Sequence, residues 1–346
     1  CGPSSHCAVM PIPQPTSSTP SEPDEPMDRP AVSARTRGVV LVLLGAVLWG
    51  TTGTAQALGP DSAGPLAVGT TRLVAGGGLL TLWMLISTRG LSPRGRSTRG
   101  LSTPGSGPVT GTGARPTGRP VLPVLAGAIG VAAYQLSFFA AVDRAGVAVG
   151  TAVAIGSSPV FTGLIEWAVR RQAPTARWWR STTIATAGLV LLAGPGGGAF
   201  DGIGLALVAG LSYATYAVAS KQLLDRWSPA QAMAAVFGGG AVLLLPLLVG
   251  LDLGWLADWR GVAMLLWLAG PTILVAYLLF GAGLREVTAA VGATLSLAEP
   301  LTAAILAVGI LAERPSVTQV VGAAAIGIGL GLLAVPDRRV RTTPTG

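Results

Sequence analysis

Residues 38–58 read GVVLVLLGAVLWGTTGTAQAL, an apolar segment without a charged side chain. Its length matches the roughly 20 residues that a helix needs to cross the hydrocarbon core of a bilayer. Nine similar segments follow it, and 50% of the chain is hydrophobic. The ten segments are 38–58, 65–86, 121–142, 146–169, 178–194, 202–222, 229–250, 260–283, 288–311 and 316–335. The sequence therefore predicts an all-α integral membrane protein with ten transmembrane helices.

Basic residues are distributed unequally between the connections. If the N-terminus is placed inside, the inner segments receive most of the Arg and Lys residues, including six in residues 87–120. The outer segments receive Arg144, Arg260 and Arg314. Because Lys and Arg accumulate in cytoplasmic loops, we expect a plasma-membrane protein with both termini in the cytoplasm. The net charge of +8 is then explained by this orientation and by anionic lipid, and we expect no nucleic-acid partner.

Low-complexity regions lie outside the ten segments. Residues 1–37 are rich in Pro and Ser and contain the only Cys and His residues, Cys1, Cys7 and His6. This composition cannot bury a core, which predicts a disordered cytoplasmic leader. Residues 87–120 are predicted to be a disordered inner loop, and residues 337–346 a cytoplasmic tail. Because the spans lack Cys and His, we expect no metal, no cofactor and no catalysis by these residue types.

The chain contains an internal repeat. AVG at 148–150 is followed by Pro159 and Pro195, and AVG at 290–292 by Pro300 and Pro336, with 36 residues between the prolines in both cases. This predicts two five-span repeats, at 38–195 and 202–336. Because five is odd, the second repeat must cross the membrane in the opposite sense. Inverted repeats of this kind are typical of transporters with a binding site near the midplane.

The residues also resemble the ten-span drug/metabolite transporter superfamily, in its EamA-type branch. The resemblance covers residues 38–335 and rests on motifs that occur in a fixed order. They are Leu48-Trp49-Gly50, Arg72, Pro159, Glu299-Pro300 and Glu313-Arg314. It implies two inverted five-helix repeats around a central cavity, and the export of amino acids, related metabolites or drugs. The sequence departs from this pattern in the first repeat, where Gln172 and Ser158 occupy the positions of Glu313 and Glu299.

Three charged residues lie more than two residues from either end of a predicted span, and a charge costs at least ~2.5–3.5 kcal/mol at the helix centre. Glu166 precedes Arg170 by one helical turn, which predicts a structural ion pair. Glu299 lies about 17 Å from both membrane faces, too deep to reach water. Its side chain either couples protons, binds a cationic group or accepts a structural hydrogen bond. Arg72 either binds a substrate carboxylate, pairs with Glu299, pins its span to the bundle or reaches the outer interface.

The remaining candidates are aromatic and helix-breaking residues. The aromatic candidates, which lie deep in their spans, are Trp49, Tyr134, Tyr213 and Tyr277. They either line a cavity together with Ser158 or pack the bundle. Pro159 and Pro300 are expected to break their helices. Six tryptophans near span ends are expected at the membrane interfaces: Trp167, Trp178, Trp179, Trp227, Trp255 and Trp259. Gly327 and Gly331 form a GxxxG pattern, which leaves a homodimer open.

We therefore expect an inner-membrane secondary transporter that exports amino acids or related small metabolites by alternating access. Its partners would be a small-molecule substrate and the lipid bilayer. The alternative is a broad drug or toxic-compound exporter. An embedded enzyme or scaffold is disfavoured because the spans contain no paired carboxylates for acid–base chemistry. A GxxxxGK[ST] phosphate loop is also absent from the sequence, which argues against direct use of ATP.

Overall fold

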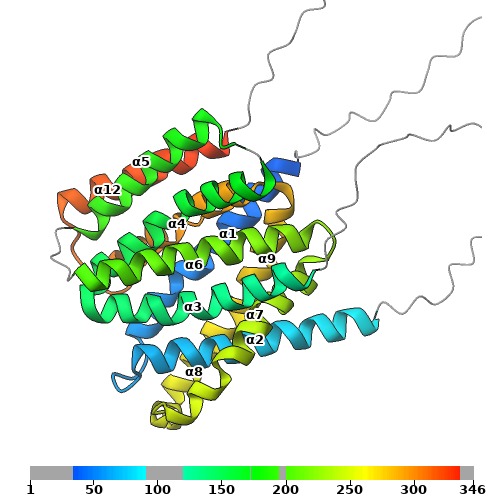
Figure 1. Ribbon diagram of the computed structural model, residues 1–346. Coiled ribbons are helices and arrows are strands. Elements are labelled where there is room, and N and C mark those ends of the chain that lie inside the picture. Colours follow the sequence, from blue (N-terminus) through cyan, green and yellow to red (C-terminus); the bar gives the residue numbers. More distant parts are fainter. Residues whose placement is uncertain (1–33, 91–119, 172, 195–199, 336–346) are drawn as a thin grey trace, which may run out of the picture. The chain divides into compact units, whose positions relative to one another are not determined.

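The computed structural model describes residues 34–90, 120–171, 173–194 and 200–335 (Figure 1). Its helices are α1 (Ala34–Ala57), α2 (Pro65–Gly90), α3 (Val121–Ala145), α4 (Val147–Arg170), α5 (Ala176–Ala193), α6 (Phe200–Leu224), α7 (Pro229–Leu244), η1 (Leu245–Gly250), η2 (Gly254–Ala257), α8 (Trp259–Ala269), η3 (Gly270–Val275), α9 (Ala276–Glu286), α10 (Ala289–Leu295), α11 (Ala298–Gly309) and α12 (Val317–Ala334). These ranges contain no strand, which confirms the all-α class. Residues 91–119 of the loop predicted at 87–120, most of the leader, Gln172, Pro195, Pro336 and the tail lie outside them.

Nine helical stretches in these ranges are long and apolar enough to cross a membrane. The remaining predicted span, the fifth along the chain, is α5, which is 18 residues long and carries Arg177 and Arg180 near its start. The first span begins at Ala34, inside the segment that we assigned to the leader. Helices suit this environment because they satisfy their backbone hydrogen bonds internally, which hydrocarbon cannot do for them.

Two spans of the second half are interrupted. One consists of α8, the π-helical turn η3 and α9, and Pro271 lies inside that turn. The other consists of α10 and α11, with Pro300 in the first turn of α11. Proline lacks a backbone N–H and its ring clashes with the preceding turn, which accounts for irregular backbone at both places.

The helix break that we expected at Pro159 does not occur, because α4 continues through this residue. In a regular helix the residue at position 159 would donate its N–H to the carbonyl of Ile155. The hydroxyl of Ser158 donates to this carbonyl instead, at 2.8 Å. The second repeat has Glu299 at the position of Ser158 and thus lacks this hydroxyl. Ser158 therefore has a structural role, since it replaces the donor that proline removes.

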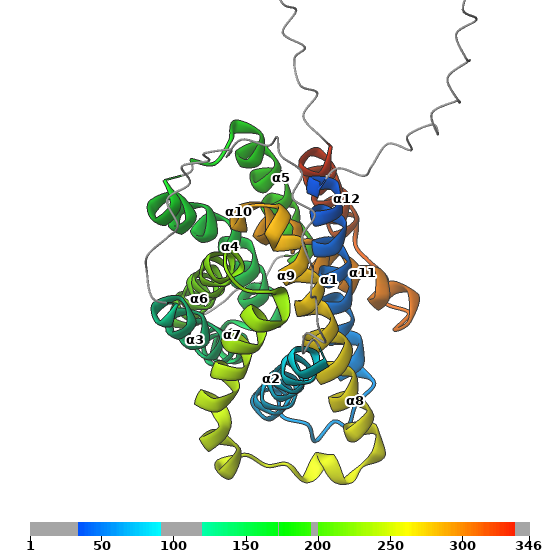
Figure 2. The same ribbon diagram turned by 90° about the vertical axis from the view of Figure 1, so that its right-hand side faces the viewer.

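Helices of the first half pack mainly against helices of the second half. α3 and α4 lie against α6, and α9 and α11 lie against α1. α2 packs on α7, and α5 on α12, where the two helices run side by side in both views (Figures 1 and 2). Exchanging the halves replaces α6 by α1, α3 by the span that contains α9, and α4 by the span that contains α10 and α11, so the first two sets of contacts exchange places. The packing fits the two-repeat architecture.

Small residues allow close approach between these helices. A Cβ atom at Gly50 of α1 would lie 2.7 Å from the backbone oxygen of Glu299 in α11. A Cβ atom at Gly188 of α5 would lie 2.6 Å from the backbone oxygen of Gly322 in α12. Small residues at such crossings are how membrane helices bring their backbones together.

Successive spans alternate in direction, so the bundle has two ends. We call the end with the start of α1 and the α4–α5, α6–α7 and α9–α10 connections the N-terminal end. The opposite end, which we call the cavity end, contains the α1–α2, α3–α4, α7–α8 and α11–α12 connections. Arg37–Glu286 (2.7 Å) and Arg170–Asp225 (2.8 Å) are ion pairs of the N-terminal end. Arg144–Asp201 (3.3 Å) joins α3 to α6 at the cavity end.

Candidate functional site

A cavity of about 1000 Å³ extends into the bundle from the cavity end. Its mouth includes Gln56 and Pro65 on one side and the exposed Glu313 and Arg314 on the other. Deeper, its wall is formed by α1, α2, α3, α4 and α11. α5 contributes Leu192, and α12 contributes Gln319, Val320 and Ala323. Most of the lining is apolar. The few polar and charged side chains at its inner end therefore define what the cavity can bind.

Five of the predicted residues meet in this central cavity, although they come from four helices. They are Trp49 of α1, Arg72 of α2, Tyr134 of α3, and Glu299 and Pro300 of α11. The close approach of α1 and α11 at Gly50 sets Trp49 beside the start of α11. Tyr213, Tyr277 and Ser158 are not part of the lining.

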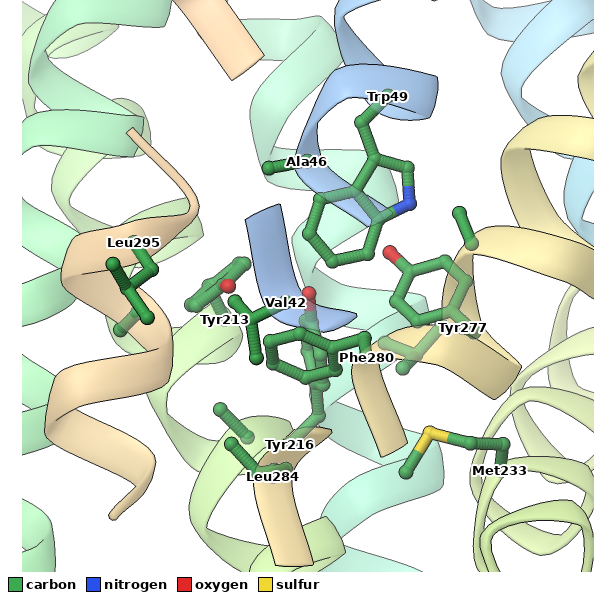
Figure 3. Packing of buried hydrophobic residues seen from close by; sticks show 14 of the residues in the cluster. Val42, Ala46, Trp49, Tyr213, Tyr216, Met233, Tyr277, Phe280, Leu284 and Leu295 are labelled. Carbon is green, nitrogen blue, oxygen red and sulfur yellow. The ribbon is translucent and has the colours of Figure 1, made fainter. Parts of the chain in front are cut away.

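Tyr213 and Tyr277 belong to a layer of aromatic rings in the buried core next to the inner end of the cavity (Figure 3). The ring of Tyr277 lies 4.8 Å from that of Trp49 and 3.8 Å from that of Phe237, measured between centroids. The hydroxyl of Tyr213 is hydrogen-bonded to that of Ser296 at 2.9 Å. We call this layer the aromatic floor; it consists of Trp49, Tyr213, Tyr216, Phe237, Tyr277 and Phe280. Four of its rings are at most 4% exposed, and Tyr213 and Tyr277 are 8% exposed.

Three buried donors of the cavity wall have no hydrogen-bond partner within the described ranges. They are Nε1 of Trp49, Nε of Arg72 and Nε2 of Gln135. A buried donor without a partner costs about 1–3 kcal/mol, so an acceptor group supplied by a ligand would be favourable here. All three are donors, which points to an oxyanion such as a carboxylate.

Gln135 was not among our predicted site residues. It is 5% exposed, and its Nε2 packs so closely on α2 that a Cβ atom at Gly69 would lie 2.4 Å from it. Arg72 follows Gly69 by three residues on the same helix, so the two donors belong to neighbouring parts of the wall. A glutamine in the middle of an apolar span was the available signal, because polar residues inside a membrane span usually have a function.

Arg72 and Glu299 do not form an ion pair with each other in this structure. Glu299 makes no hydrogen bond through its carboxylate to another described residue, and it is partly exposed to the cavity. The cavity thus offers unpaired donors, from Trp49, Arg72 and Gln135, and an unpaired acceptor, the carboxylate of Glu299.

Glu166 does not pair with Arg170, in contrast to our prediction. Its carboxylate accepts hydrogen bonds from the backbone N–H groups of Ala289 (2.9 Å) and Ala290 (2.8 Å), and Arg170 pairs with Asp225. The first amides of a helix lack partners within the helix and attract negative charge, so α10 supplies a better partner than an arginine in the same helix. Trp178 and Trp255 do not face the lipid as interface anchors would, since each is 2% exposed.

Comparisons with known proteins agree with the duplication. A model of the EamA-like transporter family matches residues 36–194 and again residues 201–335. The chain is 38% identical over 306 residues to the protein named Uncharacterized transporter YwfM of Bacillus subtilis (strain 168), which covers 88% of this chain and 95% of that protein. A solved crystal structure matches with a TM-score of 0.68, covering 87% of this chain and 99% of its own. At 20% identity this last likeness shows the fold alone.

Proposed function

The chain belongs to the EamA-like transporter family, and we propose that it is a secondary transporter of the plasma membrane that exports amino acids or related small metabolites. As a multi-pass membrane transporter it contacts lipid and binds a small-molecule substrate. The proposal concerns the substrate class, the direction of transport and the mechanism.

The observation that supports this substrate class is that unpaired hydrogen-bond donors and an unpaired carboxylate line the same cavity. A zwitterionic amino acid presents a carboxylate, which can accept from Arg72 and Gln135, and an ammonium group, which can bind Glu299. The apolar wall with Tyr134 would receive the side chain. A volume of about 1000 Å³ is at the upper end for small-molecule sites, so bulky side chains fit.

Alternating access is supported by the fact that the cavity is open at one end of the bundle and closed at the other. The cavity reaches the surface at the cavity end, whereas the aromatic floor and the contacts of the N-terminal end lie on its other side. Two five-span repeats of opposite sense can exchange these states by rocking, which would open the cavity at the N-terminal end. We place that end in the cytoplasm, on the basis of the basic residues.

We further propose that Glu299 couples transport to protons. It is the acidic residue at the inner end of the cavity, and its carboxylate is free to take up a proton or a cationic group. A coupling group must change its charge as the site changes sides.

Transport into proteoliposomes tests the substrate class. Free amino acids should be transported. Derivatives with either an acetylated amine or an amidated carboxyl should be transported poorly, because each lacks one of the two charged groups that the site binds. Equal transport of free and blocked derivatives would contradict the proposal. It would favour the second candidate, a broad drug or toxic-compound exporter. The size and the aromatic lining of the cavity support this candidate.

A further inference from the structure

The α9–α10 connection at the N-terminal end is held by two buried charged side chains. Nζ of Lys221 in α6 donates to the backbone oxygens of Leu284 (2.6 Å) and Arg285 (3.2 Å), in the last turn of α9. The carboxylate of Glu166 in α4 accepts from the first two amides of α10, as described above. A cation thus meets the C-terminal end of one helix and an anion the N-terminal end of the next, which is the favourable arrangement for both helix dipoles.

Helix α5 adds two further contacts to α10. Nε1 of Trp178 donates to the backbone oxygen of Ala290 at 3.0 Å, and the hydroxyls of Thr182 and Thr294 are 2.8 Å apart. Glu166 is 3% exposed and Lys221 is 9% exposed. We call Glu166, Lys221, Trp178 and Thr182 the α9–α10 clamp. Three of its four residues come from helices of the first half and hold a helix of the second half.

The clamp connects to the transport site through the chain itself. α10 ends at Leu295, and α11 begins at Ala298, directly before Glu299. Ser296, between the two helices, is bonded to Tyr213 of the aromatic floor. A movement of α10 would therefore move both the floor and the start of α11.

The clamp is also asymmetric between the repeats. Counted from the prolines at 159 and 300, Glu166 corresponds to Ala307. The helix that corresponds to α10 is α4, and it begins after Gly146 without a side-chain cap. A buried carboxylate thus secures α10 at the N-terminal end, and no carboxylate of the described residues does the same for α4 at the cavity end, where the cavity is open.

We propose that the α9–α10 clamp is a releasable lock that keeps the N-terminal end closed while the cavity is open at the other end. Glu166 and Lys221 are then positioning residues, which set the balance between the two states without touching substrate. The inference rests on the alternating access proposed above.

Cysteine labelling tests the lock in purified protein without substrate. In a background with Cys1→Ser and Cys7→Ser, Ser220→Cys reports on the N-terminal end, because Ser220 is fully buried and shares the face of α6 with Tyr213 and Tyr216. Thr151→Cys, in the cavity wall, reports on the cavity end. A water-soluble thiol reagent should react slowly at position 220 and rapidly at position 151.

Glu166→Gln removes the charge and leaves at most one oxygen to accept from the two amides. Labelling at position 220 should become at least about tenfold faster, as expected when hydrogen bonds to a buried charge are lost. Labelling at position 151 should become slower, because the population shifts away from the cavity-open state. Lys221→Met should act in the same direction. Arg37→Gln is the matched control, since it breaks an ion pair at the same end in which Arg37 is mostly exposed, and it should change neither rate by more than about twofold.

Several results would contradict the proposal that the α9–α10 clamp is a releasable lock. Unchanged rates in both folded variants would show that the clamp does not set the balance, and faster labelling at both positions would show general loosening. If neither variant folds while Arg37→Gln does, the clamp is a permanent part of the fold. The assay needs no substrate, so failure of the amino-acid transport test would leave a positive labelling result in place and refute only the substrate class.

Discussion

The unpaired donors of the central cavity come from different helices. Gln135 packs on α2 at Gly69, one helical turn before Arg72. Neither Nε of Arg72 nor Nε2 of Gln135 has an acceptor among the described residues. A side chain that only pinned α2 to the bundle would be expected to have such an acceptor, because an unpaired buried donor is costly. We therefore favour binding of a substrate carboxylate as the role of Arg72.

Arg72→Lys tests this role. Lysine keeps the charge but loses the planar fork that binds a carboxylate through two hydrogen bonds. The apparent KM for amino acids should increase about tenfold, corresponding to the loss of one charge-assisted hydrogen bond, while the amount of protein in the membrane stays the same. Transport kinetics and quantitative immunoblotting measure these two quantities. A variant that fails to accumulate would instead support a pinning role.

Corresponding spans of the two repeats differ in continuity where one residue beside a proline differs. Ser158 keeps α4 continuous across Pro159, whereas Glu299 stands at the equivalent position before Pro300, where the span is divided into α10 and α11. The α5–α12 pair depends on residues without a side chain, since Gly188 and Gly322 face each other across the contact. In contrast, a Cβ atom added at Gly327 or Gly331 of α12 would meet no atom of the described residues within 4 Å, so their GxxxG pattern points away from α5.

Gly188→Ala tests the α5–α12 contact. The added methyl group would lie 2.6 Å from one backbone atom of α12 and 2.7 Å from another, which cannot move aside as a side chain could. The free energy of unfolding should decrease by about 1–3 kcal/mol, as is typical of overpacking. Gly327→Ala is the control, and its stability should stay within about 0.5 kcal/mol of the parent. Thermal unfolding in detergent gives the comparison, and equal stability of the two variants would contradict this packing.

The sequence was sufficient for features that depend on local composition. Segment length and hydropathy predicted the spans, and the proline spacing predicted the duplication, because both are properties of consecutive residues. Contacts between distant residues could not be predicted in this way. The i, i+4 rule assigned Arg170 to Glu166, but the amides of Ala289 and Ala290, more than 120 residues away, are the actual partners. Tyr213 and Tyr277 were deep in their spans as expected, yet depth does not distinguish a cavity wall from the floor beside it.

At the scale of the whole molecule, the two ends of the bundle differ in their number of basic residues. Arg144 is paired with Asp201, and Arg260 donates to the backbone oxygens of Leu58 and Gly59, so two basic residues of the cavity end are engaged by the protein. Arg314 lies at the cavity mouth. We assign the cavity end to the outside of the cell and the N-terminal end to the cytoplasm, since few basic residues occur at the cavity end.

Reporter fusions test this orientation. A reporter enzyme that is active only outside the cytoplasm should be inactive when fused at Gly105 and active when fused at Gly197. These positions belong to connections that we assign to opposite sides. The opposite pattern of activity would reverse the assignment, and with it the direction of transport that we propose.

The central claim is that the cavity around Glu299 is the site at which substrate transport is coupled to protons. Glu299→Gln in proteoliposomes tests it most directly, because glutamine keeps the size and hydrogen-bonding capacity but cannot change its charge. We predict a folded variant that still exchanges substrate between the two sides at saturating substrate concentration, since the amide oxygen of glutamine can still accept from the substrate's ammonium group. This variant should have lost uphill transport driven by a pH gradient. Uphill transport by Glu299→Gln at the rate of the parent would contradict the claim.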